Sequence, residues 1–85
     1  MIRIQIPHNY WIRILLHYEN LLAERFMHEH VTPRTQYEMQ AFLQHHVRVA
    51  QQRETHLAWY VPLQLRFSNG LAIVEPVDPT SIEIV

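Results

Sequence analysis

One glutamate and one histidine are the residues best placed for acid–base chemistry. Glu19 falls near the middle of the apolar face of a helix expected over residues 10–28, and His46 lies at the centre of the equivalent face of a second helix, given a rotation of about 100° per residue. If a tight turn makes these helices antiparallel, the two side chains come within one helical turn of each other. A carboxylate beside an imidazole can orient it and charge it for proton transfer.

The same pair also has a structural interpretation. A buried carboxylate needs a hydrogen-bonding partner, and a Glu–His contact would fix the register of the two helices. No serine, threonine or cysteine stands beside the pair as a nucleophile, which a catalytic triad requires. Arg53 also falls near this face and is an alternative partner for Glu19. The sequence therefore favours a structural pair and keeps Glu19 and His46 as the candidate catalytic residues.

A second polar group lies on the opposite side of the first helix and could bind a metal ion. His17, Glu24 and His28 fall within about 40° of one another on the helical wheel, and these residue types ligate zinc and other divalent ions. However, His17 and Glu24 stand about 10 Å apart along the axis, so an ion would need a ligand from elsewhere or from a second subunit. The alternative is a solvated face with an i,i+4 pair. We expect no cofactor and no metal, with these three residues as the candidates.

Composition excludes several classes of function. Seven arginines without a lysine and eight acidic residues give a net charge of -1, which offers no broad field for phosphate groups, so nucleic-acid binding is not expected. The chain has no cysteine and one glycine, which excludes disulfides, thiolate chemistry and a glycine-rich phosphate loop. RNA binding on an open sheet face, through Tyr60, Arg66 and Arg3, is kept as a further alternative.

The clearest structural pattern is a β-hairpin in the C-terminal half. Apolar residues occupy every second position from Leu57 to Phe67, as in a strand with one buried face. Asn69-Gly70 is the preferred pair for a two-residue turn, and residues 71–75 then return. Pro62 interrupts the longer strand, because proline cannot donate to a ladder, so we predict a bend or bulge there.

Two helices and two terminal strands complete the expected fold. Asn9 is the expected N-cap of the helix over residues 10–28. Thr32 before Pro33 marks the start of a second helix that continues to about residue 52, and the spacing from Thr35 to Glu38 suggests a capping box.

The chain ends carry similar short alternating patterns. Residues 2–6 and 82–84 alternate isoleucine with polar residues, and pairing of the termini would place Glu83 opposite Arg3. The sequence therefore predicts one α+β domain over residues 1–85, in the order β-α-α-β-β-β. Its helical hairpin packs on one face of a small, mainly antiparallel sheet.

Apolar residues on two further surfaces indicate an interaction protein. On the first helix, Ile14 and Leu21 lie beside His17, away from the main apolar face. On the sheet, further apolar residues lie on the outer face. The expected interface residues are Ile14, His17, Leu21, Tyr60, Pro62 and Ile73. A domain this small with apolar residues on both faces commonly hides one of them in a subunit contact. Isolated exposed apolar residues are nevertheless normal.

These patterns predict a small non-enzymatic protein-binding module that acts as a homodimer: an accessory subunit, regulator or inhibitor with a protein partner. The first alternative is a small metal- or proton-handling enzyme that uses a Glu/His pair. No apolar run approaches the roughly 18 residues that cross a bilayer, and residues 1–6 are typical of a strand rather than of a secretory signal. The expected location is therefore the cytoplasm, without membrane contact.

Overall fold

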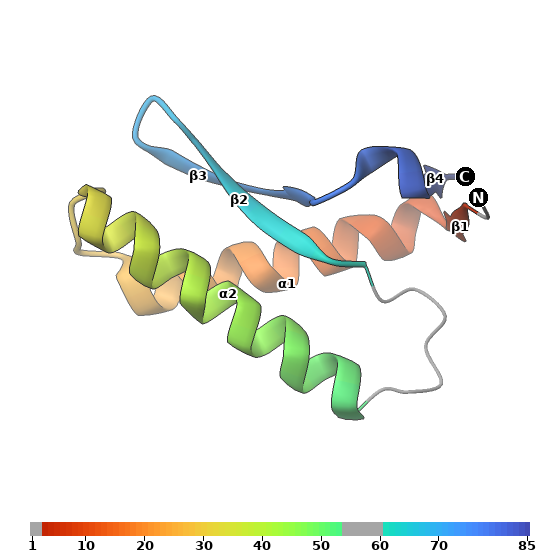
Figure 1. The fold of residues 1–85 in the computed structure, drawn as a ribbon, viewed down its shortest axis with the longest axis horizontal. Helices are drawn as coiled ribbons and strands as arrows, with labels where there is room; N and C mark the ends of the chain where they lie inside the picture. The colour runs from red at the N-terminus through yellow and green to blue at the C-terminus, as the bar shows by residue number, and fades with distance from the viewer. Residues whose placement is uncertain (1–2, 54–60) are drawn as a thin grey trace.

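The protein combines a helical hairpin with short strands. The computed structural model describes residues 3–53 and 61–85. In chain order the elements are β1 (Ile4–Ile6), α1 (His8–Phe26), α2 (Pro33–Arg53), β2 (Leu63–Ser68), β3 (Leu71–Pro76), the 3-10 helix η1 (Pro79–Ser81) and β4 (Ile82–Ile84). Figure 1 shows the β2–β3 hairpin lying across the helices, with both chain ends together at one end of the molecule. The predicted α+β class and element order are confirmed.

The β2–β3 hairpin forms as the alternation predicts. Leu65 lies opposite Val74 and Phe67 opposite Ala72 in an antiparallel register, and all four side chains belong to the core or pack against it. The turn is built by Asn69 and Gly70, whose φ angles are 52° and 76°, as a turn with positive φ at both central positions requires. The strand predicted from Leu57 is described only from residue 61 onwards, and β2 begins directly after Pro62.

The terminal strands pair, but in a sheet of their own. β1 and β4 run parallel, with Gln5 rather than Arg3 opposite Glu83, and the backbone bonds extend the pair through Val85 N–H to the Ile6 carbonyl at 2.9 Å. The described strands therefore form two two-stranded sheets instead of one mainly antiparallel sheet.

The 3-10 helix η1 connects β3 to β4. At its start the Asp78 carboxylate accepts hydrogen bonds from the Thr80 N–H at 3.1 Å and from the Thr80 hydroxyl at 2.6 Å.

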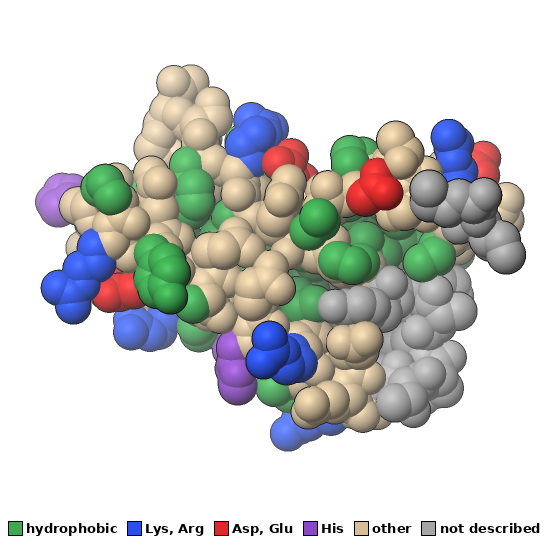
Figure 2. All heavy atoms as spheres, viewed as in Figure 1, with side chains coloured by type: hydrophobic (Ala, Val, Ile, Leu, Met, Phe, Trp, Pro, Cys, Tyr) green, Lys and Arg blue, Asp and Glu red, His purple; other side chains and the backbone are tan. Residues whose placement is uncertain are grey.

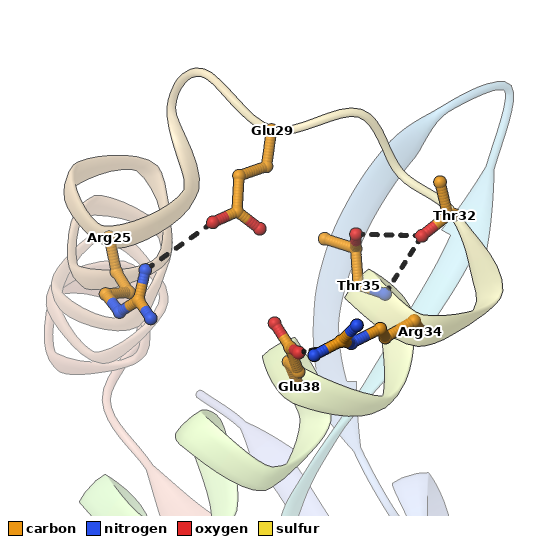
Figure 3. Close-up of polar contacts among 6 residues, drawn as sticks. All are labelled: Arg25, Glu29, Thr32, Arg34, Thr35 and Glu38. Carbon is orange, nitrogen blue, oxygen red and sulfur yellow. Dashed lines mark hydrogen bonds and ion pairs between the residues drawn. The ribbon is translucent and has the colours of Figure 1, made fainter.

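The helix starts follow the prediction at α2 and depart from it at α1. The Thr32 hydroxyl accepts the Thr35 N–H at 3.2 Å (Figure 3), which confirms the expected start of α2. The predicted capping box of Thr35 and Glu38 does not form, because Thr35 lies inside the helix, which begins at Pro33. Glu38 accepts a bond from Arg34 at 3.1 Å. The prediction of Asn9 as N-cap is also wrong.

Helix α1 begins at His8 without a side-chain cap. Its first N–H donates to the Val85 carbonyl at 2.8 Å, and the N–H groups of Tyr10 and Trp11 bond to the Pro7 carbonyl. The C-terminal strand thus satisfies a donor that a capping side chain would otherwise satisfy, so the helix starts earlier than its sequence suggests.

The core lies between the helices and the inner face of the hairpin. Its three most deeply buried side chains come from three elements: Ile6, Leu43 and Leu63. Around them pack Tyr18, Leu22, Phe26, Met39, Val47, Val61 and Val74. The Phe26 and Phe42 rings meet edge to face at 5.6 Å, a geometry that aromatic pairs prefer and that joins α1 to α2.

Two glutamines of α2 bind the outer edge of β2. The Leu65 N–H donates to Gln40 Oε1 at 2.8 Å, and Gln44 Nε2 donates to the Leu63 carbonyl at 2.8 Å. The two glutamines are four residues apart and therefore lie on one side of the helix. They occupy the positions that a neighbouring strand would bond, so the helix closes this edge of the sheet.

Replacing either glutamine should destabilise the protein. We expect Gln40→Leu and Gln44→Leu each to lower the free energy of unfolding by about 1–3 kcal/mol, because a backbone group at the edge of the core loses its partner. Urea unfolding measures this, with Gln51→Leu as the control on an exposed position of the same helix. A loss for Gln40→Leu no larger than that of the control would contradict the role of this edge contact.

Candidate functional site

The expected contact between Glu19 and His46 does not form. Glu19 is exposed, whereas the buried positions of α1 are Tyr18, Leu22 and Phe26. The prediction of a buried Glu19 is therefore wrong: the residue lies about 100° around the helix from Tyr18. No hydrogen bond or ion pair within residues 3–53 and 61–85 joins Glu19 to His46 or to Arg53.

His46 has an aromatic environment instead. It is half-buried, and its ring lies 4.4 Å from the Phe42 ring and 5.4 Å from the His45 ring, measured between centroids. Phe42 in turn contacts Phe26, so His46 lies at the end of a row of rings between the helices. This arrangement supports packing of the helices, and within residues 3–53 and 61–85 no carboxylate makes a hydrogen bond or ion pair with His46 that could serve proton transfer.

The candidate metal ligands point to solvent rather than to one ion. His17, Glu24 and His28 are all exposed, and the His17 ring packs edge-on against Tyr18 at 5.0 Å. Among the residues that the structure describes, no three histidine, aspartate or glutamate side chains come together in a way that could hold a metal ion. The stripe predicted from the helical wheel thus does not converge within one chain.

The remaining charges near the helix connection form surface ion pairs. Arg25 lies 3.7 Å from Glu29, and Arg34 lies 3.1 Å from Glu38 (Figure 3). Both pairs have the i,i+4 spacing and are solvent-exposed, so each contributes at most about 0.5 kcal/mol. Their chemistry is that of a solvated helix surface.

The outer face of the hairpin carries a cluster of polar side chains. Arg66 donates to Glu75 across the strands at 3.2 Å, and Gln64 bonds the same carboxylate at 3.5 Å. The positive charge that the RNA alternative assigned to Arg66 is thus already compensated. Figure 2 shows charged side chains interspersed with small hydrophobic groups on the face viewed there.

The expected interface residues lie in different environments. Ile14 and Leu21 are half-buried and pack against the core, so they contribute little exposed apolar surface. His17 and Pro62 are exposed and Ile73 is half-buried. Tyr60 lies outside the described residues.

The exposed apolar surface of α1 lies on a different side from the expected one. Ile12 and Leu16, four residues apart, are 41% and 51% exposed. Ala23 and Met27 continue this stripe. The wheel could not locate it, because apolar residues occur almost all the way around this helix.

A shallow hollow of about 320 Å³ connects this side of α1 to the hairpin. Glu19 and Ala23 line it from the helix, while Leu71 and Ala72 line it from β3. Leu71 is 66% exposed. The hollow brings Ala23 of this stripe close to the start of β3. Because Ile12 and Leu16 continue the stripe along the same side of the helix, we call this surface the α1–β3 side: Ile12, Leu16, Ala23, Leu71 and Ala72. Sequence reasoning missed this surface, since it depends on how the hairpin crosses the helices.

Comparisons with known proteins add no assignment: no family model, curated protein or solved structure matches this chain. The described helices include none with the length and apolar character needed to span a bilayer. The local geometry is therefore the basis for any proposal about function.

The exposure of Glu19 predicts that its side chain contributes little to the stability of the protein. We expect Glu19→Gln to change the free energy of unfolding by less than about 0.5 kcal/mol, as surface substitutions do, and the double variant with His46→Gln to show no coupling. Urea unfolding of the two single variants and the double variant measures both quantities. A coupling above about 1 kcal/mol would contradict the separation of these residues.

Proposed function

We propose that this protein is a non-enzymatic protein-binding module that acts as a homodimer. The observation that carries the proposal is a group of large apolar side chains that stay exposed: Ile12 is 41%, Leu16 51% and Leu71 66% exposed. Exposed apolar side chains that lie close together are typical of protein–protein contacts.

Small domains bury a low fraction of their surface and often gain stability from association. A second copy of the chain that covers these side chains would remove apolar surface from water.

The α1–β3 side is the proposed contact surface. It holds Ile12, Leu16 and Leu71, which are among the most exposed large apolar residues described, next to the hollow. An apolar centre bordered by polar side chains is typical of the core of an interface. This surface replaces the expected one around Ile14 and Leu21.

No observation favours the enzyme alternative. Glu19 and His46 occupy separate environments, and the histidine–glutamate stripe of α1 does not converge on one point. We therefore assign the chain the role of an accessory subunit, regulator or inhibitor of another protein. The cytoplasm is its proposed location.

Light scattering coupled to size-exclusion chromatography tests this function. We expect a mass twice the 10.3 kDa of one chain at micromolar concentration, and a shift towards the monomer in the double variant Ile12→Gln, Leu16→Gln, because polar side chains remove apolar area from the contact.

Tyr37→Gln serves as the matched control, since Tyr37 is 77% exposed on α2 and lies outside the α1–β3 side. It should leave the mass unchanged. A monomeric mass for the unmodified protein throughout the concentration range, or equal effects of the α1 variant and the control, would overturn the proposal.

A further inference from the structure

The exposed side of α1 carries two opposite charges that form no ion pair within the chain. Arg13 and Glu19 are both exposed, and neither makes a hydrogen bond or ion pair with any residue that the structure describes. By contrast, Arg25, Arg34 and Arg66 each form an ion pair with a glutamate. The fold of one chain therefore gives these two charges of α1 no partner.

The two charges are placed symmetrically about Leu16. They lie three residues before it and three residues after it, which puts each about 4.5 Å from Leu16 along the helix axis and about 60° to either side of it. Leu16 is 51% exposed. An apolar side chain thus projects between a cation on one flank, Arg13, and an anion on the other, Glu19.

We infer that a second copy of this chain packs its α1 antiparallel against this α1, with the two Leu16 side chains meeting on a two-fold axis. This inference rests on the proposed homodimer and specifies its contact. A two-fold axis at Leu16 brings Arg13 of each copy to the height of Glu19 of the other, so two equivalent ion pairs form across the contact. The axes of packed helices lie about 8–10 Å apart, a distance that the long side chain of arginine bridges.

The charges select both the orientation and the partner. In a parallel pairing Arg13 would meet Arg13 and Glu19 would meet Glu19, and like charges across a contact disfavour association. In the antiparallel pairing the unlike charges meet, whereas the two copies of Glu19 stay about 9 Å apart along the axis. Because both complementary charges belong to one helix, this surface is complementary to itself, as the isologous contact of a two-fold dimer requires.

The same register covers the exposed apolar side chains of α1. Leu16 meets Leu16, Ile12 of each copy lies at the height of Asn20 of the other, and Ala23 lies at the height of Asn9. All five residues are exposed in the single chain, and none of these positions brings two like charges together. An apolar centre with polar and charged residues around it is the usual composition of a protein–protein contact.

Charge reversal tests this pairing. Arg13→Glu would place two carboxylates opposite each other at both ion pairs, and Glu19→Arg would place two guanidinium groups there. We expect each single variant to raise the dissociation constant of the dimer at least about fivefold at low ionic strength, where salt screens surface charges least. Light scattering over a concentration series measures the dissociation constant.

The double variant Arg13→Glu, Glu19→Arg exchanges the two charges and restores both ion pairs. Its dissociation constant should return to within about twofold of that of the unmodified protein. Net charge does not explain such a rescue, because the two single changes shift the net charge in opposite directions and the double variant keeps the value of -1. A contact within one helix does not explain it either, since residues six apart do not face each other.

Arg48→Glu is the matched control. Arg48 is exposed on α2 and forms no ion pair in the described part of the chain, and its reversal changes the net charge as Arg13→Glu does. It should leave the dissociation constant unchanged. Single reversals on α1 with no larger effect than this control, or a double variant that dimerises no better than the weaker single variant, would overturn the pairing.

Mixing the two single variants gives a second measurement. In a mixed dimer each variant supplies the charge that the other lacks, so both ion pairs form. We expect an equimolar mixture to show the mass of a dimer at a concentration where each variant alone is monomeric. Circular dichroism checks that the variants are folded, as expected for exchanges between good helix formers on an exposed helix surface. A mixture that stays monomeric would contradict the pairing.

The outcomes separate this inference from the proposed function. A dimer whose dissociation constant responds to none of the charge reversals on α1 would contradict the α1 pairing and leave the homodimer standing. A monomer of the unmodified protein would overturn both.

Discussion

The hydrogen bonds from Gln40 and Gln44 to the edge of β2 are the constraint on which the arrangement of this molecule depends. A two-stranded hairpin has little stability by itself, and here it is attached to α2 through the Leu65 N–H and the Leu63 carbonyl at 2.8 Å. Leu63 is 2% exposed, so its carbonyl would lack a partner without Gln44. These contacts fix which edge of the hairpin faces the helix.

Attaching one edge determines where the other strand lies. With β2 held above α2, strand β3 lies on the side of α1. The same placement brings Leu71 beside the exposed stripe of α1 across the hollow. The placement of the hairpin therefore determines which apolar side chains of α1 and β3 stay exposed on this side of the molecule.

The sequence predicted those parts of the fold that depend on local patterns. Alternation and Asn69-Gly70 predicted the hairpin, because the period of a strand and the positive φ of the turn are properties of adjacent residues. The start of α2 was predicted for a similar reason, since the Thr32 hydroxyl bonds an N–H only three residues away. The start of α1 was not, because it depends on Val85, at the far end of the chain.

The predicted contact between Glu19 and His46 was wrong because of the way α1 packs. Apolar residues surround most of this helix, so the wheel accommodates more than one buried face, and tertiary packing selects the one centred on Tyr18. That selection moves Glu19 to the surface and exposes Ile12 and Leu16. A rotation of about 100° thus converts an apparent acid–base pair into an exposed acid beside an apolar stripe.

Amide hydrogen exchange, followed residue by residue, tests the central claim most directly: the edge of β2 is closed by the glutamine side chains of α2. The Leu65 N–H is expected to exchange slowly, because Gln40 Oε1 accepts it at 2.8 Å, and to exchange faster in the Gln40→Leu variant, where it has no acceptor. Rapid exchange at Leu65 in the unmodified protein, or equal protection of this N–H in the Gln40→Leu variant, would contradict the claim.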